Sequence, residues 1–153
     1  MTELEILYQT AYDSDISIWN TNFSPTKKAA CLCLNGDNNL IVLDDEKITS
    51  ESEEAEILTH ELAHIESGNL FFITASVNGP LERANQRFYE AATTRETILK
   101  LLPKNKLQKA IYSEGADCWK IAEYCGRTID FVKKAFEVYE NMGVVFDVPD
   151  YAG

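Results

Sequence analysis

The spacing of hydrophobic residues changes several times along the first third of the chain. Hydrophobic residues recur at helical spacing up to Ala11, which predicts a short amphipathic helix. Residues 16–19 alternate between apolar and polar and predict a β-strand. Two apolar runs at 29–34 and 40–43 flank the turn-forming residues 35–39, and this pattern predicts a β-hairpin.

A second helical pattern lies between two end signals. Ser50 followed by Glu53 has the sequence of a capping box, in which the serine side chain accepts the backbone N–H of the third residue. Gly68 stands where a left-handed C-terminal cap belongs. Three residues between these signals are spaced to face the core: Leu58, Leu62 and Ile65. We therefore predict a helix between Ser50 and Gly68.

The rest of the chain is predicted to be mainly helical. A loop or short strand at 69–80 precedes a long helical pattern at 81–102, which Pro103 ends. One face of that helix carries Ala84, Phe88, Ala91 and Ile98. Three shorter helices and a short strand or docking segment follow: 104–112, 116–124, 128–141 and 144–148. The sequence thus predicts an α+β fold, with a domain of residues 1–102 and a helical subdomain of residues 103–153.

Composition limits the class of protein. The chain has 153 residues, enough to bury a core without disulfides, and its formal net charge of −11 argues against a general nucleic-acid surface. No signal peptide pattern opens the chain and no apolar run approaches membrane-spanning length, so we expect a cytoplasmic protein. The four cysteines lack CxxC spacing and are expected to be reduced, partly buried thiols rather than a second metal site: Cys31, Cys33, Cys118 and Cys125.

Both histidines of the chain lie in the stretch His60-Glu61-Leu62-Ala63-His64, an HExxH motif. On a helix, residues four apart lie one turn apart on the same side, so both imidazoles can bind one zinc ion at about 2.0–2.1 Å. Glu61 is rotated off that line, where it can act on a water molecule as general base. The alternative is a pair of surface or core histidines without a metal; two lone histidines at this spacing favour the zinc site.

A catalytic zinc needs a third protein ligand, and with no histidine left this must be a carboxylate or a thiolate. The HExxH motif, Glu90 and the Leu101-Leu102-Pro103 ending of the next helix resemble the ImmA/IrrE family of zinc metallopeptidases. The segment from Trp119 to Ala135 is similar to the helical end of the short phage and mobile-element members of that family.

This resemblance implies a zincin-like fold, in which a small antiparallel or mixed sheet packs on the HExxH helix and a helical segment follows. It implies a hydrolase that uses Zn2+, with His60, His64 and Glu90 as metal ligands and Glu61 as the catalytic base. Its implied substrate is a protein, a helix-turn-helix repressor of a phage or mobile element, which the protease cleaves or inactivates. No membrane is implied.

The sequence departs from the family pattern after the third ligand. Thr93 and Thr94 stand where the family prefers Ala and Asp or Asn, and Glu96 stands where an aromatic residue is usual. Glu82 on the same predicted helix therefore remains the alternative third ligand. Without the family pattern, Glu90 would be interpreted as a surface carboxylate.

Two further expectations concern the substrate. By analogy with zincins, an extended peptide is expected to pair with the edge of the strand at 40–43, which precedes the motif helix. The residue that would stabilise the oxyanion is open among Arg87, Tyr89 and Tyr112.

Two other classes of function compete with the peptidase. One is a zinc-binding anti-repressor or adaptor that does not hydrolyse its partner. The other is a DNA-binding regulator, because Ile121, Gly126 and Val132 have the spacing of a helix-turn-helix core. Direct nucleic-acid binding is disfavoured, since Lys133 and Lys134 are interleaved with acidic residues.

Overall fold

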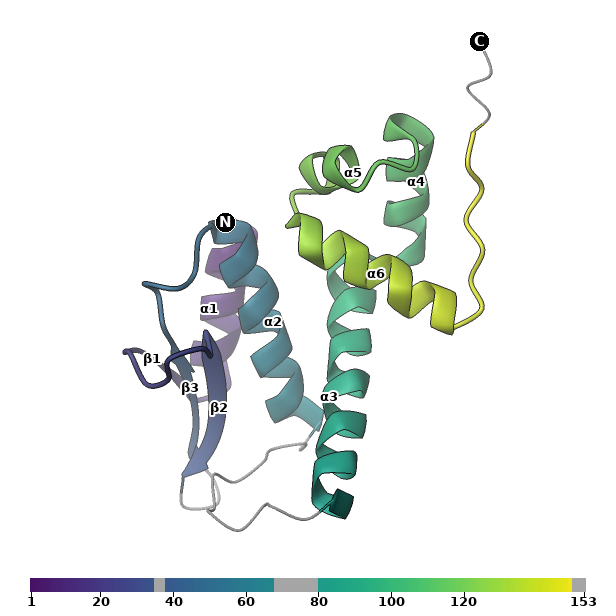
Figure 1. The fold of residues 1–153 in the computed structure, drawn as a ribbon. Coiled ribbons are helices and arrows are strands. Elements are labelled where there is room, and N and C mark those ends of the chain that lie inside the picture. The colour runs from purple at the N-terminus through teal and green to yellow at the C-terminus, as the bar shows by residue number, and fades with distance from the viewer. Residues whose placement is uncertain (35–37, 68–79, 150–153) are drawn as a thin grey trace. The chain divides into compact units, whose positions relative to one another are not determined.

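The computed structural model describes residues 1–34, 38–67 and 80–149, with side chains described except at 33, 34, 38 and 80–85. This part of the chain is α+β, with helices and one mixed sheet, as predicted (Figure 1). The elements in chain order are α1 (Glu3–Asp13), β1 (Ile16–Asn20), β2 (Ala29–Leu34), β3 (Asn38–Leu43), α2 (Glu51–Ser67), α3 (Pro80–Leu101), α4 (Lys104–Glu114), α5 (Cys118–Cys125) and α6 (Ile129–Asn141).

Backbone contacts divide the chain into two compact units, Met1–Thr94 and Arg95–Gly153. The division falls within α3, and the expected domain boundary after residue 102 stays a prediction. The predictions for 69–79 and for a cap at Gly68 lie outside the described residues. Among the described residues, no helix combines the length and the apolar character needed to cross a membrane.

The sheet of the first unit has β3 at its centre. β3 runs parallel to β1 and antiparallel to β2, so the predicted hairpin is confirmed as the β2–β3 pair. Because β3 is paired along both sides, it offers no edge, and the expectation that a substrate pairs along 40–43 is wrong. Within the described residues β1 and β2 are the two edge strands of the sheet, and β2 contacts α2.

Helix α2 begins as the capping signal predicts, with one difference. The Ser50 hydroxyl accepts the Glu53 N–H at 3.1 Å, and the Glu54 N–H donates to the Ser50 carbonyl at 3.0 Å. The Glu53 carboxylate, however, accepts the Thr49 N–H at 3.3 Å and pairs with Lys28 at 3.0 Å. The helix start is therefore fixed both by its own cap and by the segment that leads into β2.

The core of the first unit is formed by one side of the sheet, α1 and α2. Leu58 is fully buried and Leu62 is 5% exposed, which confirms that this face of α2 points inward. Burial of each such side chain contributes about 1.5–3 kcal/mol. The cluster consists of Ala11, Ile16, Ile41, Leu43, Leu58 and Leu62, with Ile65 packed at its border. These contacts leave the adjoining face of α2 to the HExxH residues.

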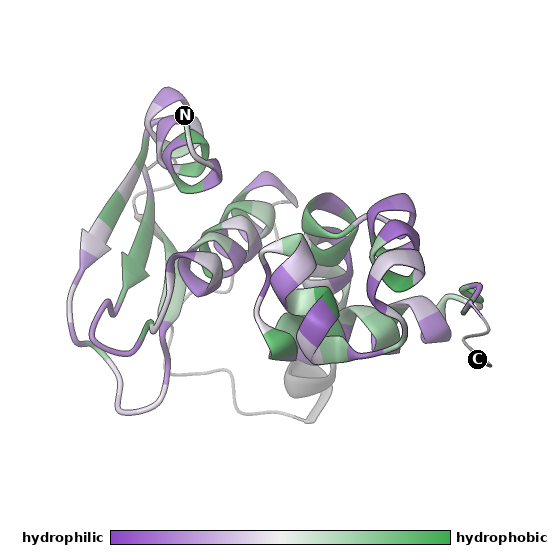
Figure 2. Ribbon diagram, turned by 90° about the horizontal axis from the view of Figure 1, so that it is seen from above, coloured by the Kyte–Doolittle hydropathy of each residue, from purple (hydrophilic) through white to green (hydrophobic). Residues whose placement is uncertain are grey.

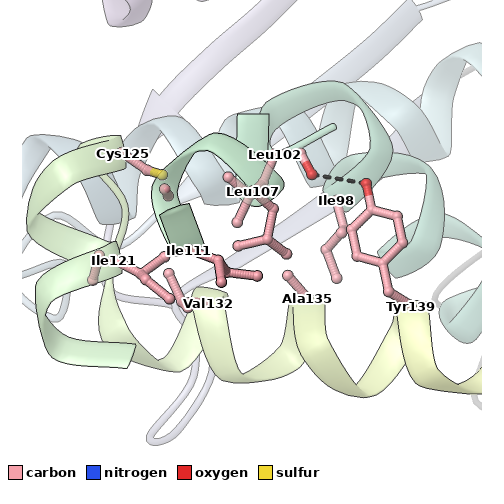
Figure 3. Close-up of a cluster of buried hydrophobic side chains, with 11 residues drawn as sticks. Ile98, Leu102, Leu107, Ile111, Ile121, Cys125, Val132, Ala135 and Tyr139 are labelled. Carbon is pink, nitrogen blue, oxygen red and sulfur yellow. Dashed lines mark hydrogen bonds between the residues drawn. The ribbon is translucent and has the colours of Figure 1, made fainter. Parts of the chain in front are cut away.

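The core of the second unit is formed by the end of α3 together with α4, α5 and α6 (Figure 3). Its largest fully buried side chains come from all four helices: Ile98, Leu102, Leu107, Ile111, Ile121, Val132 and Tyr139. The Tyr139 hydroxyl donates to the Leu102 carbonyl at 2.8 Å (Figure 3), so both buried polar groups are satisfied.

Short polar and glycine signals fix the ends of the last helices. Asp117 caps α5 by accepting the N–H groups of Trp119 and Lys120, and Thr128 caps α6. Gly126 ends α5 in the left-handed conformation, with φ 67°. The helices predicted at 104–112, 116–124 and 128–141 are confirmed within a few residues.

The segment after α6 docks on the second unit without forming a strand. Val144 and Phe146 pack against its core. The Gln108 side chain donates to the Asp147 carbonyl at 2.8 Å and accepts the Asp147 N–H at 2.9 Å. A docking segment is therefore confirmed at 144–148, and a strand there is wrong.

The apolar face of α3 is buried only in part. Phe88 is 70% exposed and Ala91 is exposed, whereas Ile98 is buried as expected; Ala84 lies outside the described side chains. Thr93 is instead buried. Figure 2 shows that hydrophilic and hydrophobic residues are mixed around the helices. Polar contacts of α3 with the HExxH helix account for this pattern of exposure.

Candidate metal centre

Helix α2 brings the two imidazoles together, as the spacing predicts. Their Nε2 atoms are 3.2 Å apart, and the rings meet edge to face with centroids 4.8 Å apart. The His64 side chain is 6% exposed and that of His60 is 21% exposed. The two histidines therefore lie at the border between the core and the surface of the first unit.

Glu90 of α3 faces both rings. Its Oε1 lies 2.6 Å from Nε2 of His60, and its Oε2 lies 2.9 Å from Nε2 of His64. Hydrogen bonds with His60 and then His64 lower the pKa of Glu90 well below its usual range, which outweighs the opposing effect of burial. The carboxylate therefore stays charged and carries a negative charge directly beside the two imidazole nitrogens.

These three side chains meet the spacing that one metal ion requires. Bonds of about 2.0–2.2 Å at tetrahedral angles hold donor atoms roughly 3.3 Å apart. The two nitrogens are already at 3.2 Å, and the carboxylate would have to withdraw by only about 0.5 Å from its hydrogen-bonded position. Two imidazoles and one carboxylate are also a donor set that zinc accepts in catalytic sites. The residues therefore fit the ion.

Among the described side chains, His60, His64 and Glu90 are the one group of three or more such ligands close enough to share an ion. Cys31, Cys118 and Cys125 are free thiols, partly or fully buried as expected, and none belongs to the group. The side chains of Cys33 and of Glu82, the alternative third ligand, lie outside the described residues.

Glu61 follows His60 in the sequence but is not one of the group. Only 9% of it is exposed, and burial raises the pKa of this carboxyl above its usual value, although attraction to His60 and a hydrogen bond from Cys31 oppose the rise. A carboxyl with a raised pKa is suited to accept and return protons near neutral pH.

Two neighbours of the motif helix were not predicted from the sequence. The thiol of Cys31 on β2 donates to the Glu61 carboxylate, and burial raises the pKa of that thiol far enough to keep its proton in place. The Thr93 hydroxyl lies 3.2 Å from Nδ1 of His64. The only sequence signal for either was that Thr93 departs from the family pattern.

The three candidates for stabilising an oxyanion gain no support. Tyr112 belongs to the second unit, where its hydroxyl donates to the Asp147 carboxylate at 3.2 Å. Arg87 and Tyr89 are exposed on α3. The residue for this role stays open.

Comparisons of the chain with protein-family models, with curated proteins and with solved structures found no match. The resemblance to the ImmA/IrrE family therefore stays a prediction. A function has to be inferred from the geometry of the side chains themselves.

Proposed function

We propose that this protein is a zinc-dependent endopeptidase with a zincin-like active site. The observation that supports the proposal is the meeting of His60, His64 and Glu90, with Nε2 atoms 3.2 Å apart and the carboxylate within 2.9 Å of both. Glu61, a buried carboxyl on the same helix as the two histidines, interacts electrostatically with all three of these residues. This combination provides both a metal site and a proton acceptor.

In the proposed mechanism His60, His64 and Glu90 hold the ion. Zinc supplies Lewis-acid polarisation of a peptide carbonyl and lowers the pKa of water to about 7 in such sites. The Glu61 carboxylate takes the proton of the attacking water and passes it to the amine of the leaving peptide. Its burial favours the first of these transfers, because the raised pKa stabilises the protonated carboxyl that this transfer produces.

The edge of β2 is the proposed binding site for an extended substrate. β2 pairs with β3 alone in the described part of the chain, and Cys31 of β2 contacts Glu61. A peptide that paired with this edge would lie beside the general base, with main-chain hydrogen bonds providing affinity. The helix-turn-helix repressor remains the proposed substrate, and its support is the family resemblance of the sequence.

A DNA-binding function is less well supported. Helices α5 and α6 are joined at Gly126 and contact each other, as in a helix-turn-helix. The exposed side of α6, however, pairs Lys134 with Glu137 at 3.2 Å and also carries Asp130 and Glu140. Such a mixed surface is poor for phosphate binding.

The decisive test combines metal analysis with cleavage. Protein purified without chelator is expected to hold about one zinc per chain, and His60→Ala to remove it. Glu61→Gln should retain zinc and lower cleavage of a fluorogenic peptide library, and of a repressor encoded beside this chain, by about 10²–10⁴-fold. Glu51→Gln, an exposed position on the same helix, is the matched control.

The outcomes separate the alternatives. Absence of zinc in the unchanged protein overturns the proposal. Zinc without cleavage of any probe supports the non-hydrolytic anti-repressor instead. Cleavage by Glu61→Gln at the rate of the unchanged protein would show that Glu61 is not the base.

A further inference from the structure

Thr93 lies one helical turn beyond Glu90 on α3 and is 1% exposed. It is not a metal ligand in the proposed centre. A buried hydroxyl costs free energy unless its hydrogen bonds are satisfied, so its partners reveal why it is tolerated there.

In the described part of the chain, the hydroxyl of Thr93 contacts the Tyr89 carbonyl and the His64 ring, and it plays a different role toward each. It donates to the Tyr89 carbonyl at 2.9 Å, in the usual geometry of a helical threonine. A hydroxyl has one proton, and that proton is used in this bond. Toward Nδ1 of His64, 3.2 Å away, the oxygen can therefore only accept.

The direction of this hydrogen bond fixes the tautomer of His64. Nδ1 must carry a ring proton in order to donate to Thr93. A metal would then displace the proton with which Nε2 bonds Glu90 and would bind the Nε2 lone pair. Nε2 lies on the side of His60 and Glu90, where the proposed ligands meet. The same bond orients the ring, because both nitrogens of His64 now have defined partners.

We propose that Thr93 is a positioning residue that holds His64 in its metal-binding tautomer and orientation, and so sets the affinity of the centre for zinc. This inference rests on the proposed metal centre and adds a determinant outside its ligands. Mutation of a residue that hydrogen-bonds the second nitrogen of a metal-binding histidine typically weakens metal affinity by about 10–100-fold. A hydroxyl is an uncharged acceptor, so it fixes the ring without adding a second negative charge beside Glu90.

Three variants at two positions test the role of the hydroxyl. Thr93→Val keeps the β-branched shape and removes the oxygen, whereas Thr93→Ser keeps the oxygen. Thr97→Val removes a hydroxyl that is also buried, one turn further along α3. Zinc affinity is measured by competition with a chromophoric chelator at neutral pH. The visible spectrum of the cobalt-substituted protein reports the geometry of the ligands.

Thr93→Val is expected to bind zinc about 10–100-fold more weakly, while Thr93→Ser and Thr97→Val stay within about threefold of the unchanged protein. The cobalt spectrum should change in Thr93→Val and not in Thr93→Ser. Unchanged affinity in Thr93→Val overturns the inference. Equal losses in the Val and Ser variants, together with a lower melting temperature of the chelated protein, also overturn it, because they indicate a packing role.

These results are distinguishable from failure of the proposed function. If the unchanged protein binds no zinc, the metal centre itself is wrong and Thr93 has no ligand to position. If all variants bind zinc equally, the centre stands and only the role of Thr93 is wrong.

Discussion

Replacing Glu61 with glutamine is expected to stabilise the metal-free protein although it removes the proposed general base. Glu61 is 9% exposed, and burial is the main cause of its raised pKa. A buried carboxylate loses hydration that its partners only partly replace. Glutamine has nearly the same shape and its carbonyl can accept the Cys31 thiol, so the main change is removal of the buried charge.

The expected gain in the free energy of unfolding is modest, because neighbouring groups already offset part of the cost of burying the Glu61 charge. His60 and His64 attract the Glu61 carboxylate, and this attraction is lost in the variant. Single stabilising substitutions commonly add about 0.5–2 kcal/mol to the free energy of unfolding. We expect a gain of about 1 kcal/mol in the free energy of unfolding at pH 8, which for a chain of this size raises the melting temperature by roughly 2–4 °C.

The gain should depend on pH with a defined sign. The pKa of Glu61 is raised above the usual 4.5 in the folded protein, so the folded state binds a proton at a pH where the unfolded chain has lost it. As the pH falls through the raised folded pKa toward 4.5, the unchanged protein gains stability relative to the variant. The advantage of Glu61→Gln is therefore largest above that window and shrinks toward acid.

Urea unfolding in the presence of a chelator, at several pH values from 8 to 5, measures this difference. The lowered pKa of Glu90 also makes stability pH-dependent, but this contribution is common to both proteins and cancels to first order. Glu51→Gln, at an exposed position, should show no difference from the unchanged protein. A Glu61→Gln protein that is less stable at pH 8, or an advantage that grows toward acid, would refute the reasoning.

Two predictions concern the second unit. Tyr139→Phe removes the hydroxyl that donates to the Leu102 carbonyl at 2.8 Å. It should lower the free energy of unfolding by about 1–3 kcal/mol in urea titrations. A change as small as that caused by Tyr124→Phe, at an exposed position, would contradict this prediction. Gly126→Ala should cost about 1 kcal/mol from backbone strain alone, because φ is 67° and an added Cβ would meet no atom within 4 Å; Gly126→Asn, which tolerates this conformation better, should cost less in the same assay.

Local patterns predicted the elements well because their causes are local. The capping serine of α2 and the glycine that ends α5 each lie within a few residues of the group that they satisfy. The order of the strands depends instead on which partners meet in three dimensions. For that reason β3 could be identified as a strand while its central position, between β1 and β2, was not foreseen.

In the candidate site, too, the sequence predicted the local contacts and missed those made by other elements of the fold. The approach of His60 to His64 follows from one turn of helix, and the choice of Glu90 came from a family pattern rather than from physical spacing. Thr93 and Cys31 reach the motif from other elements, α3 and β2. Apolar periodicity carries no information about such polar contacts, which is also why it does not reveal that Phe88 is exposed.

The contacts of Glu90 and Thr93 explain why α3 turns a polar face inward. In the first unit, Glu90 contacts both imidazoles of α2, and Thr93 contacts the far nitrogen of His64. Glu90 and Thr93 lie one turn apart on the same side of α3. The side of α3 that faces the two histidines is therefore polar. Hydrogen bonds thus arrange the proposed ligands in the absence of an ion. In the proposed centre an ion would replace the contacts of Glu90 with both rings but could leave the contact of Thr93 with His64 intact, so Thr93 would keep His64 in place both with and without the ion.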